Sequence, residues 1–234
     1  MKQLEGKWAL VTGASRGVGQ QVARALAAAG CRMILHSRTT EHTAALATEF
    51  RNQGIIVHQV QAELNDSVAV TGLAHQVKAI CGTLDILYNN AAIMTPYHEN
   101  YLEAVPAEYE LSFRVNTIAP ILLCNYFLPG MIGQKWGRIV NVTSGIKDQP
   151  ELMAYAASKA ALDKYVYDMA PKLAASGVTM NLLDPGWLRT DLGGPNAPGA
   201  VESVLPGALV PVLAKDRISG QFLHAQDFTG KTAK

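Results

Sequence analysis

The chain has 234 residues, of which 49% are hydrophobic and 17% are charged, and its formal net charge is +1 at pH 7. This composition is typical of a globular protein with a sizeable core, and the balanced charge excludes the basic surface that nucleic acid or membrane binding needs. We therefore expect a soluble protein that binds neither. Lys2, Glu5 and Lys7 precede the first apolar run, so we also expect no signal peptide.

The cysteines and histidines indicate neither disulfide nor metal chemistry. Cys31, Cys81 and Cys124 lie far apart and form no C-x-x-C pair, so we expect reduced thiols and a cytoplasmic location. The six histidines show no metal-binding spacing, and we expect no metal. The most apolar stretch, residues 117–133, contains two prolines and an asparagine, so we interpret it as too short and too broken to span a bilayer.

Short apolar runs alternate along the chain with longer amphipathic segments. The runs predict strands at residues 8–13, 32–37, 55–61, 84–90, 137–144, 178–186 and 220–226. The amphipathic segments predict helices at residues 18–30, 41–54, 66–82, 106–131 and 151–176. Continuous apolar strands between helices predict an α/β fold of the Rossmann type, with a doubly wound, mainly parallel sheet covered on both faces.

Nothing in the composition divides the chain, and we expect one domain over residues 1–234. Residues 193–207 are rich in glycine and proline but lie too near the C-terminus to be a domain linker. We interpret them as a loop or a lid over a site.

A glycine-rich turn follows the first predicted strand. It reads TGASRGVG over residues 12–19, a G-x-x-x-G-x-G spacing. Glycine permits a tight turn and a close approach of backbone to a ligand, and the next helix presents free N–H groups and the positive end of its dipole. Because ligands of parallel sheets bind beyond the carboxyl ends of the strands, the turn indicates a dinucleotide site.

A tyrosine and a lysine stand four residues apart in the alanine-rich segment AYAASKAAL, residues 154–162. Alanine favours helix, and positions i and i+4 share one helix face. Tyr155 and Lys159 are therefore expected to point into the same space. Such pairs also occur by chance on solvated faces, so the spacing alone leaves both interpretations open.

Four motifs occur in an order that is similar to one enzyme family. TGASRGVG, NNAA (residues 89–92), YAASK (residues 155–159) and DPG (residues 184–186) together resemble the short-chain dehydrogenase/reductase family over essentially the whole chain. The segment DPGWLRTDLGGPNAP, residues 184–198, resembles the carbonyl-reductase-like and C-factor-like branch. The resemblance implies an oxidoreductase that transfers a hydride between a nicotinamide cofactor and a ketone, an aldehyde or a secondary alcohol.

The resemblance also implies a catalytic set of Ser144, Tyr155, Lys159 and Asn116. Tyr155 would be the general acid and base at the substrate oxygen. Lys159 would lower the pKa of the phenol and hold the nicotinamide ribose, Ser144 would hydrogen-bond the oxygen, and Asn116 would hold a water that links Lys159 to solvent. Ser144 as a turn residue and Asn116 as a buried hydrogen-bonding residue remain open alternatives.

Three departures from the family pattern bear on the site. Ser144 and Tyr155 are eleven residues apart, a little closer than expected, so the loop between them is trimmed. Ala92 replaces a glycine near the cofactor, and Glu63 stands where an aspartate usually faces adenine.

The resemblance places these residues at the cofactor: Gly13, Ser15, Arg16, Gly17, Val18, Gly19, Ser37, Arg38, Glu63, Leu64, Asn90, Ala91, Ala92, Tyr155, Lys159, Pro185, Gly186 and Thr190. An acid at the end of the second strand would select NAD(H), but Ser37 stands there and Arg38 follows it. With Arg16, two guanidinium groups could flank a 2′-phosphate. We therefore expect NADP(H) rather than NAD(H).

The expected substrate mouth is apolar or aromatic and consists of Ile93, Met94, Tyr97, Ile146, Trp187 and Leu192. It suits a small carbonyl or alcohol substrate of modest polarity. The helix at 151–176 has small and aromatic residues on more than one face. The family resemblance implies that chains pair through this helix, so we expect a homodimer or homotetramer. The alternative function is a dinucleotide-binding regulatory or signalling protein without turnover.

Overall fold

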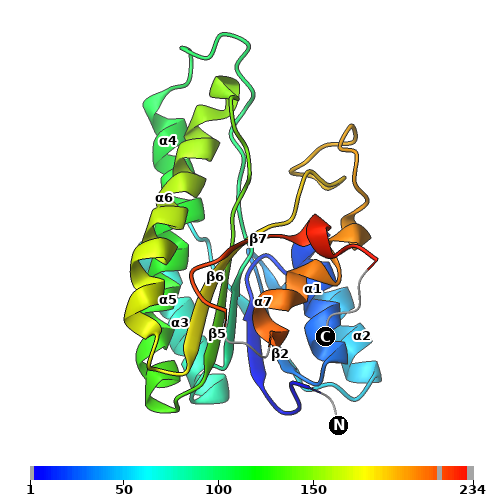
Figure 1. Ribbon diagram of the computed structural model, residues 1–234. Helices are drawn as coiled ribbons and strands as arrows, with labels where there is room; N and C mark the ends of the chain where they lie inside the picture. Colours follow the sequence, from blue (N-terminus) through cyan, green and yellow to red (C-terminus); the bar gives the residue numbers. More distant parts are fainter. Residues whose placement is uncertain (1–2, 215–217, 231–234) are drawn as a thin grey trace.

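The computed structural model describes residues 3–214 and 218–230. The domain predicted over residues 1–234 therefore includes three short segments, 1–2, 215–217 and 231–234, that lie outside the described residues. Within the described part, seven strands form one sheet in the order β3-β2-β1-β4-β5-β6-β7, and every neighbouring pair is parallel. This confirms the predicted doubly wound α/β fold (Figure 1).

The strands are short and stand close to their predicted positions. They are β1 (Trp8–Val11), β2 (Arg32–Ser37), β3 (Val57–Gln61), β4 (Ile86–Asn89), β5 (Gly137–Val142), β6 (Val178–Asp184) and β7 (Phe222–His224). Successive side chains of a strand point to opposite faces of a sheet, and here both faces are buried. On β1, Ala9 and Val11 belong to one hydrophobic cluster, whereas Leu10 belongs to the other.

Helices cover both faces. They are α1 (Gly17–Ala28), α2 (Ala44–Asn52), α3 (Ser67–Cys81), α4 (Pro106–Phe113), α5 (Ala119–Gly133), α6 (Met153–Met169) and α7 (Val210–Leu213). Buried residues of α1, α2 and α7 pack with one face of the sheet, and those of α3, α5 and α6 pack with the other. Figure 1 shows these two layers on either side of the strands.

The predicted helix at 106–131 is longer and more varied than the sequence indicated. A π-helical turn at Arg114–Ile118 joins α4 to α5, and α5 continues through Pro129 to Gly133. By length and composition, Pro106–Gly133 is the one helix among the described residues that could cross a membrane, so the expectation of a short, broken segment was wrong. Of its most apolar window 56% is buried inside the molecule, as in the core helix of a globular protein.

Two other predicted segments differ from the structure for local reasons. The helix predicted at 151–176 ends as α-helix at Met169 and continues as a 3₁₀ turn, Ala170–Leu173, in which Pro171 supplies no N–H. The loop predicted at 193–207 contains a 3₁₀ turn at Val201–Val204, and a second one begins at Gly207. Its first half belongs to a loop at residues 187–199 whose two ends meet, because Arg189 N donates to the Gly199 carbonyl at 2.8 Å. The Arg189 side chain also donates to the carbonyls of Ala197 and Pro198, at 3.0 and 2.7 Å.

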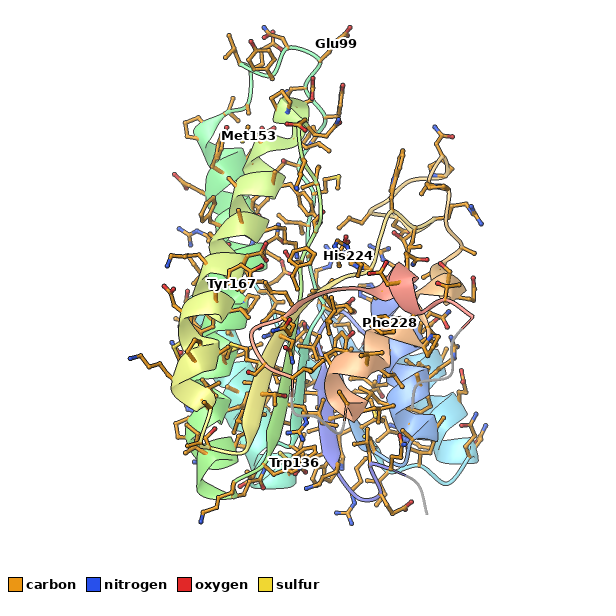
Figure 2. The ribbon with its side chains drawn as sticks, viewed as in Figure 1. Glu99, Trp136, Met153, Tyr167, His224 and Phe228 are labelled. Atoms are coloured by element: carbon orange, nitrogen blue, oxygen red, sulfur yellow. The ribbon has the colours of Figure 1, made fainter. Side chains whose placement is uncertain are left out.

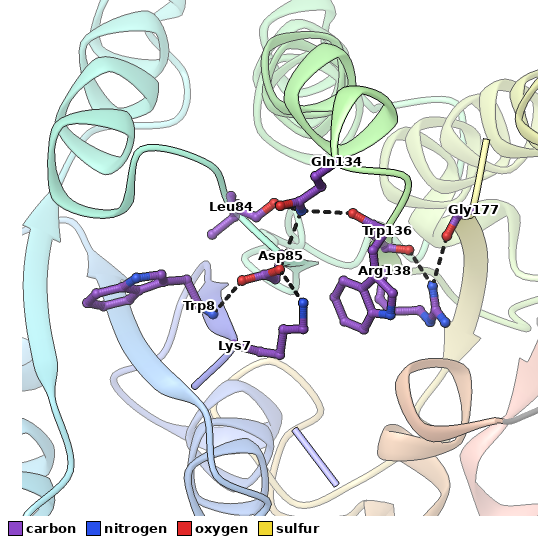
Figure 3. Close-up of polar contacts among 9 residues, drawn as sticks. Lys7, Trp8, Leu84, Asp85, Gln134, Trp136, Arg138 and Gly177 are labelled. Atoms are coloured by element: carbon purple, nitrogen blue, oxygen red, sulfur yellow. Dashed lines mark hydrogen bonds and ion pairs between the residues drawn. The ribbon is translucent and has the colours of Figure 1, made fainter. Parts of the chain in front are cut away.

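The Asp85 side chain joins the amino ends of β1 and β4 through hydrogen bonds and an ion pair (Figure 3). Its carboxylate accepts from the Lys7 ammonium at 2.9 Å, from the Trp8 backbone N–H at 2.9 Å and from the Gln134 amide at 3.4 Å. Trp136 lies beside this group, with the Lys7 ammonium 4.1 Å from its ring centre. These contacts join β1, β4 and the end of α5 at one end of the sheet.

The cysteines are free thiols in this fold. Cys31 and Cys124 are buried and Cys81 is half-buried. Burial raises their pKa values, to about 12 for Cys31 and Cys124 and to about 11 for Cys81. The thiolate is the reactive form of cysteine, and the raised pKa values keep these side chains in the thiol form at neutral pH.

Candidate active site

The carboxyl ends of β1 and β4 mark the site, because the chain builds outward from β1 to β3 and then returns to β4 on the other side of β1. Open parallel sheets bind ligands where the strand order reverses in this way. Figure 2 shows His224, at the end of β7, toward this edge, whereas Trp136 lies at the opposite end of the molecule. The loops that carry the predicted site residues meet here.

The glycine turn is packed too closely for any side chain. Gly13 has a φ of +64°, and a Cβ on it would lie 3.0 Å from the Ala91 Cα. A Cβ on Gly19 would lie 2.3 Å from the Gly13 carbonyl oxygen. Since α1 begins at Gly17, its first amides, which lack partners within the helix, face the reversal point. This backbone cradle fits a pyrophosphate.

Thr12 and Asn90 hold the turn against β4. The Thr12 hydroxyl accepts from the backbone N–H groups of Asn90 and Ala91, both at 3.0 Å. The Asn90 amide donates to the carbonyls of Thr12 and Gly13, at 2.9 and 3.2 Å. Sequence reasoning assigned Asn90 to the site but missed Thr12, although a hydroxyl residue directly before the first glycine is the signal that could have found it.

Tyr155 and Lys159 both lie on the buried side of α6. Tyr155 is 6% exposed and Lys159 3% exposed, and the Lys159 ammonium is 5.9 Å from the Tyr155 ring centre. Lys159 Nζ donates to the Val142 carbonyl at 2.8 Å. The structure therefore brings the two side chains together at the end of β5, as their spacing predicted.

The pKa of Tyr155 is shifted in the direction opposite to the one expected. The net effect raises the pKa to about 12: burial is the largest cause, a hydrogen bond with Ser144 opposes it, and the carboxylates of Asp184 and Asp163 add to it. Burial also lowers the pKa of Lys159 to about 8. The expected lowering by Lys159 was wrong because desolvation of the phenol is the largest effect and the ammonium bonds to a backbone carbonyl.

Ser144 follows β5 and reaches both the phenol and its own loop. Its hydroxyl accepts from the Ile146 N–H at 3.3 Å in addition to the hydrogen bond with Tyr155. Gly145 lets this loop lie on Asp184, since a Cβ on it would be 2.7 Å from Asp184 Oδ2. Ser144 is thus both a turn residue and a neighbour of Tyr155.

Asn116 lies fully buried in the π-helical turn. Its side-chain oxygen accepts from the Ile93 N–H at 2.9 Å, and its amide donates to the Ile93 carbonyl at 2.9 Å and to the Ser158 hydroxyl at 3.0 Å. The hydrogen-bonding interpretation that the sequence left open describes this side chain. It joins the segment after β4 to α6, beside Tyr155.

The residues expected at the 2′-phosphate are engaged with other groups or exposed. The Ser37 hydroxyl is buried and donates to the Thr39 carbonyl at 2.6 Å. Arg16 forms an ion pair with Asp191, and both side chains are about two-thirds exposed. Arg38 is exposed. The structure therefore places two guanidinium groups near the turn and the end of β2, with Arg16 turned to the loop after β6.

The remaining predicted cofactor residues line the same edge with different exposure. Ser15, Val18, Ala92 and Pro185 are half-buried, Leu64 is buried and Glu63 is exposed. Gly186 has a φ of +84° and its N–H donates to Asp184 at 2.9 Å. Thr190 accepts from the Gly193 N–H at 3.0 Å, and its methyl group would be 3.4 Å from a Cβ on Gly17.

The predicted substrate mouth is only partly assembled. Ile93, Met94 and Ile146 are half-buried, whereas Tyr97, Trp187 and Leu192 are 61%, 62% and 39% exposed. A cavity of about 580 Å³ opens beside Ser144 and Ile146, and its other walls are Gly145, Lys147, Ala156, Ala160, Asp163, Phe222 and His224. The sequence did not anticipate the contribution of α6 and β7 to this cavity.

This fold, with a glycine turn at the first helix and a buried tyrosine and lysine on α6, is that of a Rossmann-type oxidoreductase. A family model described as short chain dehydrogenase matches residues 7–199. The chain belongs to that family, as its motifs indicated. Among the described residues no group of histidine, cysteine and acidic side chains is placed to hold a metal ion.

Relatives and solved structures agree with this family. The chain is 32% identical to a 3-oxoacyl-[acyl-carrier-protein] reductase of Aquifex aeolicus, over 81% of this chain and 77% of that protein. It is 33% identical to a D-beta-hydroxybutyrate dehydrogenase of Cupriavidus necator, over 81% and 73%. A metagenomic short-chain oxidoreductase in complex with NADP matches with a TM-score of 0.80 at 31% identity, over 95% of this chain and 98% of that one. The promiscuous reductase LugOII matches with a TM-score of 0.84 at 32% identity, over 98% and 99%.

Proposed function

We propose that the protein is an NADP(H)-dependent oxidoreductase whose substrate is a small ketone or aldehyde, or the corresponding secondary alcohol. The nicotinamide supplies or accepts the hydride. The observation that carries the proposal is the pairing of two buried side chains on α6: the Lys159 ammonium lies 5.9 Å from the centre of the Tyr155 ring.

Tyr155 is the proton donor in this proposal. Because burial raises its pKa to about 12, the phenol keeps its proton at neutral pH and can deliver it to a carbonyl oxygen during reduction. The Ser144 hydroxyl donates to the same oxygen as negative charge develops there. In alcohol oxidation the phenolate would take up the proton of the alcohol.

Lys159 and Asn116 have supporting roles in this proposal. Lys159 would hold the nicotinamide ribose through its ammonium, which has a pKa of about 8. Asn116 fixes the Ile93 backbone and the Ser158 hydroxyl, so it holds α6 in place beside the cleft. Because its amide already donates to Ile93 and Ser158, a water that it relays toward Lys159 would donate to its side-chain oxygen, and we assign that relay to it as part of the same proposal.

The glycine cradle and two arginines would hold the cofactor. The unpaired N–H groups at the start of α1, which begins at Gly17, would bind the pyrophosphate. Arg16 and Arg38 would bind the 2′-phosphate, with Arg16 exchanging the Asp191 carboxylate for it. Complexes of similar structures with NADP or NADPH support this choice over NAD(H).

The assembly and location that we propose follow the family pattern: a cytoplasmic homodimer or homotetramer that acts on small molecules and binds neither nucleic acid nor membranes. A regulatory dinucleotide-binding protein without turnover is not favoured, because the similar proteins include a reductase and a dehydrogenase. Residues 187–199 would border the mouth as a self-closed loop.

A carbonyl panel tests the proposal directly. Oxidation of NADPH and of NADH is followed with ketones and aldehydes of graded size, and the reverse reaction with the matching alcohols. We expect turnover of at least one carbonyl with NADPH, loss of that turnover in Tyr155→Phe and a smaller loss in Tyr165→Phe, which alters a tyrosine elsewhere on α6. Binding of NADPH without turnover of any carbonyl or alcohol would support the regulatory alternative.

A further inference from the structure

His36 is a buried polar residue that the catalytic proposal does not use. It stands one residue before the end of β2 and is 2% exposed. Residues i and i+2 of a strand share a face, and Ile34, two residues earlier, belongs to the hydrophobic core. An apolar side chain would satisfy this position if only packing mattered, so the imidazole calls for a specific explanation.

Both ring nitrogens of His36 have partners, and the partners fix its protonation state. Nδ1 accepts from the Gly13 backbone N–H at 3.3 Å, and Nε2 lies 3.2 Å from the Ala62 carbonyl oxygen. Because an N–H donates to Nδ1, the single proton of the neutral ring must be on Nε2, where it is donated to Ala62. Each nitrogen therefore has a defined role.

The two partners belong to the two sides of the adenosine half of the cleft. Gly13 opens the glycine turn at a φ of +64°, and Ala62 directly follows β3 and precedes Glu63 and Leu64. The His36 backbone adds a third bond, since its carbonyl accepts from the Ala14 N–H at 2.9 Å. One residue thus joins the ends of β1, β2 and β3.

We propose that His36 is a positioning residue for the adenosine half of the cofactor site. The neutral ring holds the Gly13 amide and the Ala62 carbonyl at fixed separation, and so sets the width of the groove between the glycine turn and the segment after β3. This inference rests on the proposed function. It assigns His36 to cofactor affinity and not to hydride transfer, because the ring is on β2, away from Tyr155 on α6.

Substitution should separate binding from chemistry. His36→Leu fills the space but removes both hydrogen bonds, so we expect the KM for NADPH and the Kd for adenosine 2′,5′-bisphosphate to rise by about tenfold. The kcat at saturating NADPH should stay within about twofold of wild type. His36→Gln keeps one donor and one acceptor and should recover most of the affinity. Ile34→Val, on the same strand face, is the matched control and should leave both constants unchanged.

A spectroscopic measurement on the unmodified protein gives a second readout. The ¹⁵N shifts of His36 should report a neutral ring with its proton on Nε2, and the Gly13 amide should be protected from exchange. A proton on Nδ1, or equal affinity of wild type and His36→Leu for the bisphosphate, would overturn the inference and leave the proposed function intact. If wild type turns over no carbonyl and binds neither NADPH nor the bisphosphate, the proposed function fails as well.

Discussion

Acidification tests how firmly the fold holds the His36 ring neutral. Burial lowers the pKa of His36 from 6.5 to about 4, and the hydrogen bond to Ala62 offsets only part of this effect. Between these two values the unfolded chain binds a proton that the folded protein excludes. The free energy of unfolding therefore has its full His36 contribution above pH 6.5 and loses it as the pH falls toward about 4.

The size of the effect follows from the two pKa values. A separation from 6.5 to about 4, at about 1.4 kcal/mol per pKa unit, corresponds to about 3 kcal/mol of unfolding free energy. Carboxylates titrate in the same range, so a matched variant is needed. His36→Gln cannot titrate but retains a donor and an acceptor, and the difference between its pH profile and that of wild type isolates the imidazole.

Urea unfolding at a series of pH values measures this difference. We expect wild type to lose about 3 kcal/mol more than His36→Gln between about pH 7 and about pH 4. The two profiles should converge in slope above pH 6.5, where the ring is neutral in both states. Parallel profiles over the whole range would refute the reasoning, because they would mean that the ring is as easily protonated in the folded protein as in the unfolded chain.

Three further predictions concern catalysis, selectivity and stability. Tyr155→Phe should lower kcat by ~10²–10⁴-fold with NADPH binding intact, and a kcat within a few-fold of wild type would exclude Tyr155 as the proton donor. Wild type should prefer NADPH to NADH by about a hundredfold in kcat/KM, because two charge-assisted contacts would bind the 2′-phosphate. The double variant Ser37→Asp with Arg38→Ala should reverse that ratio. A wild type that prefers NADH would contradict the role given to the arginines. Asp85→Ala should lower the free energy of unfolding by about 2 kcal/mol, because the Trp8 N–H and the Lys7 ammonium lose their acceptor. The kcat should stay unchanged. An unfolding free energy equal to that of wild type in urea would contradict this prediction.

The sheet was predictable because its signal is local. Continuous apolar runs between glycine-closed helices indicate a parallel sheet, and each of the seven predicted strands is present within two or three residues of its expected ends. The helix ends were less predictable. Residues 114–118 adopt a π turn that places Asn116 against Ile93, and that geometry depends on a contact with a segment more than twenty residues earlier in the chain.

The positions of the site residues could be predicted where a motif or a spacing encodes them. Properties that depend on burial, such as a pKa, could not. The i, i+4 spacing brought Tyr155 and Lys159 together. Spacing does not reveal how far the phenol is removed from water, so the predicted direction of its pKa shift was wrong. Thr12 and His36 escaped notice because each is a single polar residue at a strand end. The pairing of Arg16 with Asp191 joins residues far apart in sequence and depends on how the loops meet.

The loop at residues 187–199 is closed by its own backbone, since Leu188 and Gly199 form an isolated bridge and the Arg189 side chain holds the carbonyls of Ala197 and Pro198. Its entry and exit are therefore neighbours whatever lies between them. Such a loop can be lengthened, shortened or exchanged between relatives as a cassette, with the sheet left undisturbed. The chain thus has a natural graft point: an exchange that keeps Thr190, which lies beside Gly17, and Asp191, which pairs with Arg16, would alter the rest of the loop and leave its contacts with the glycine turn in place.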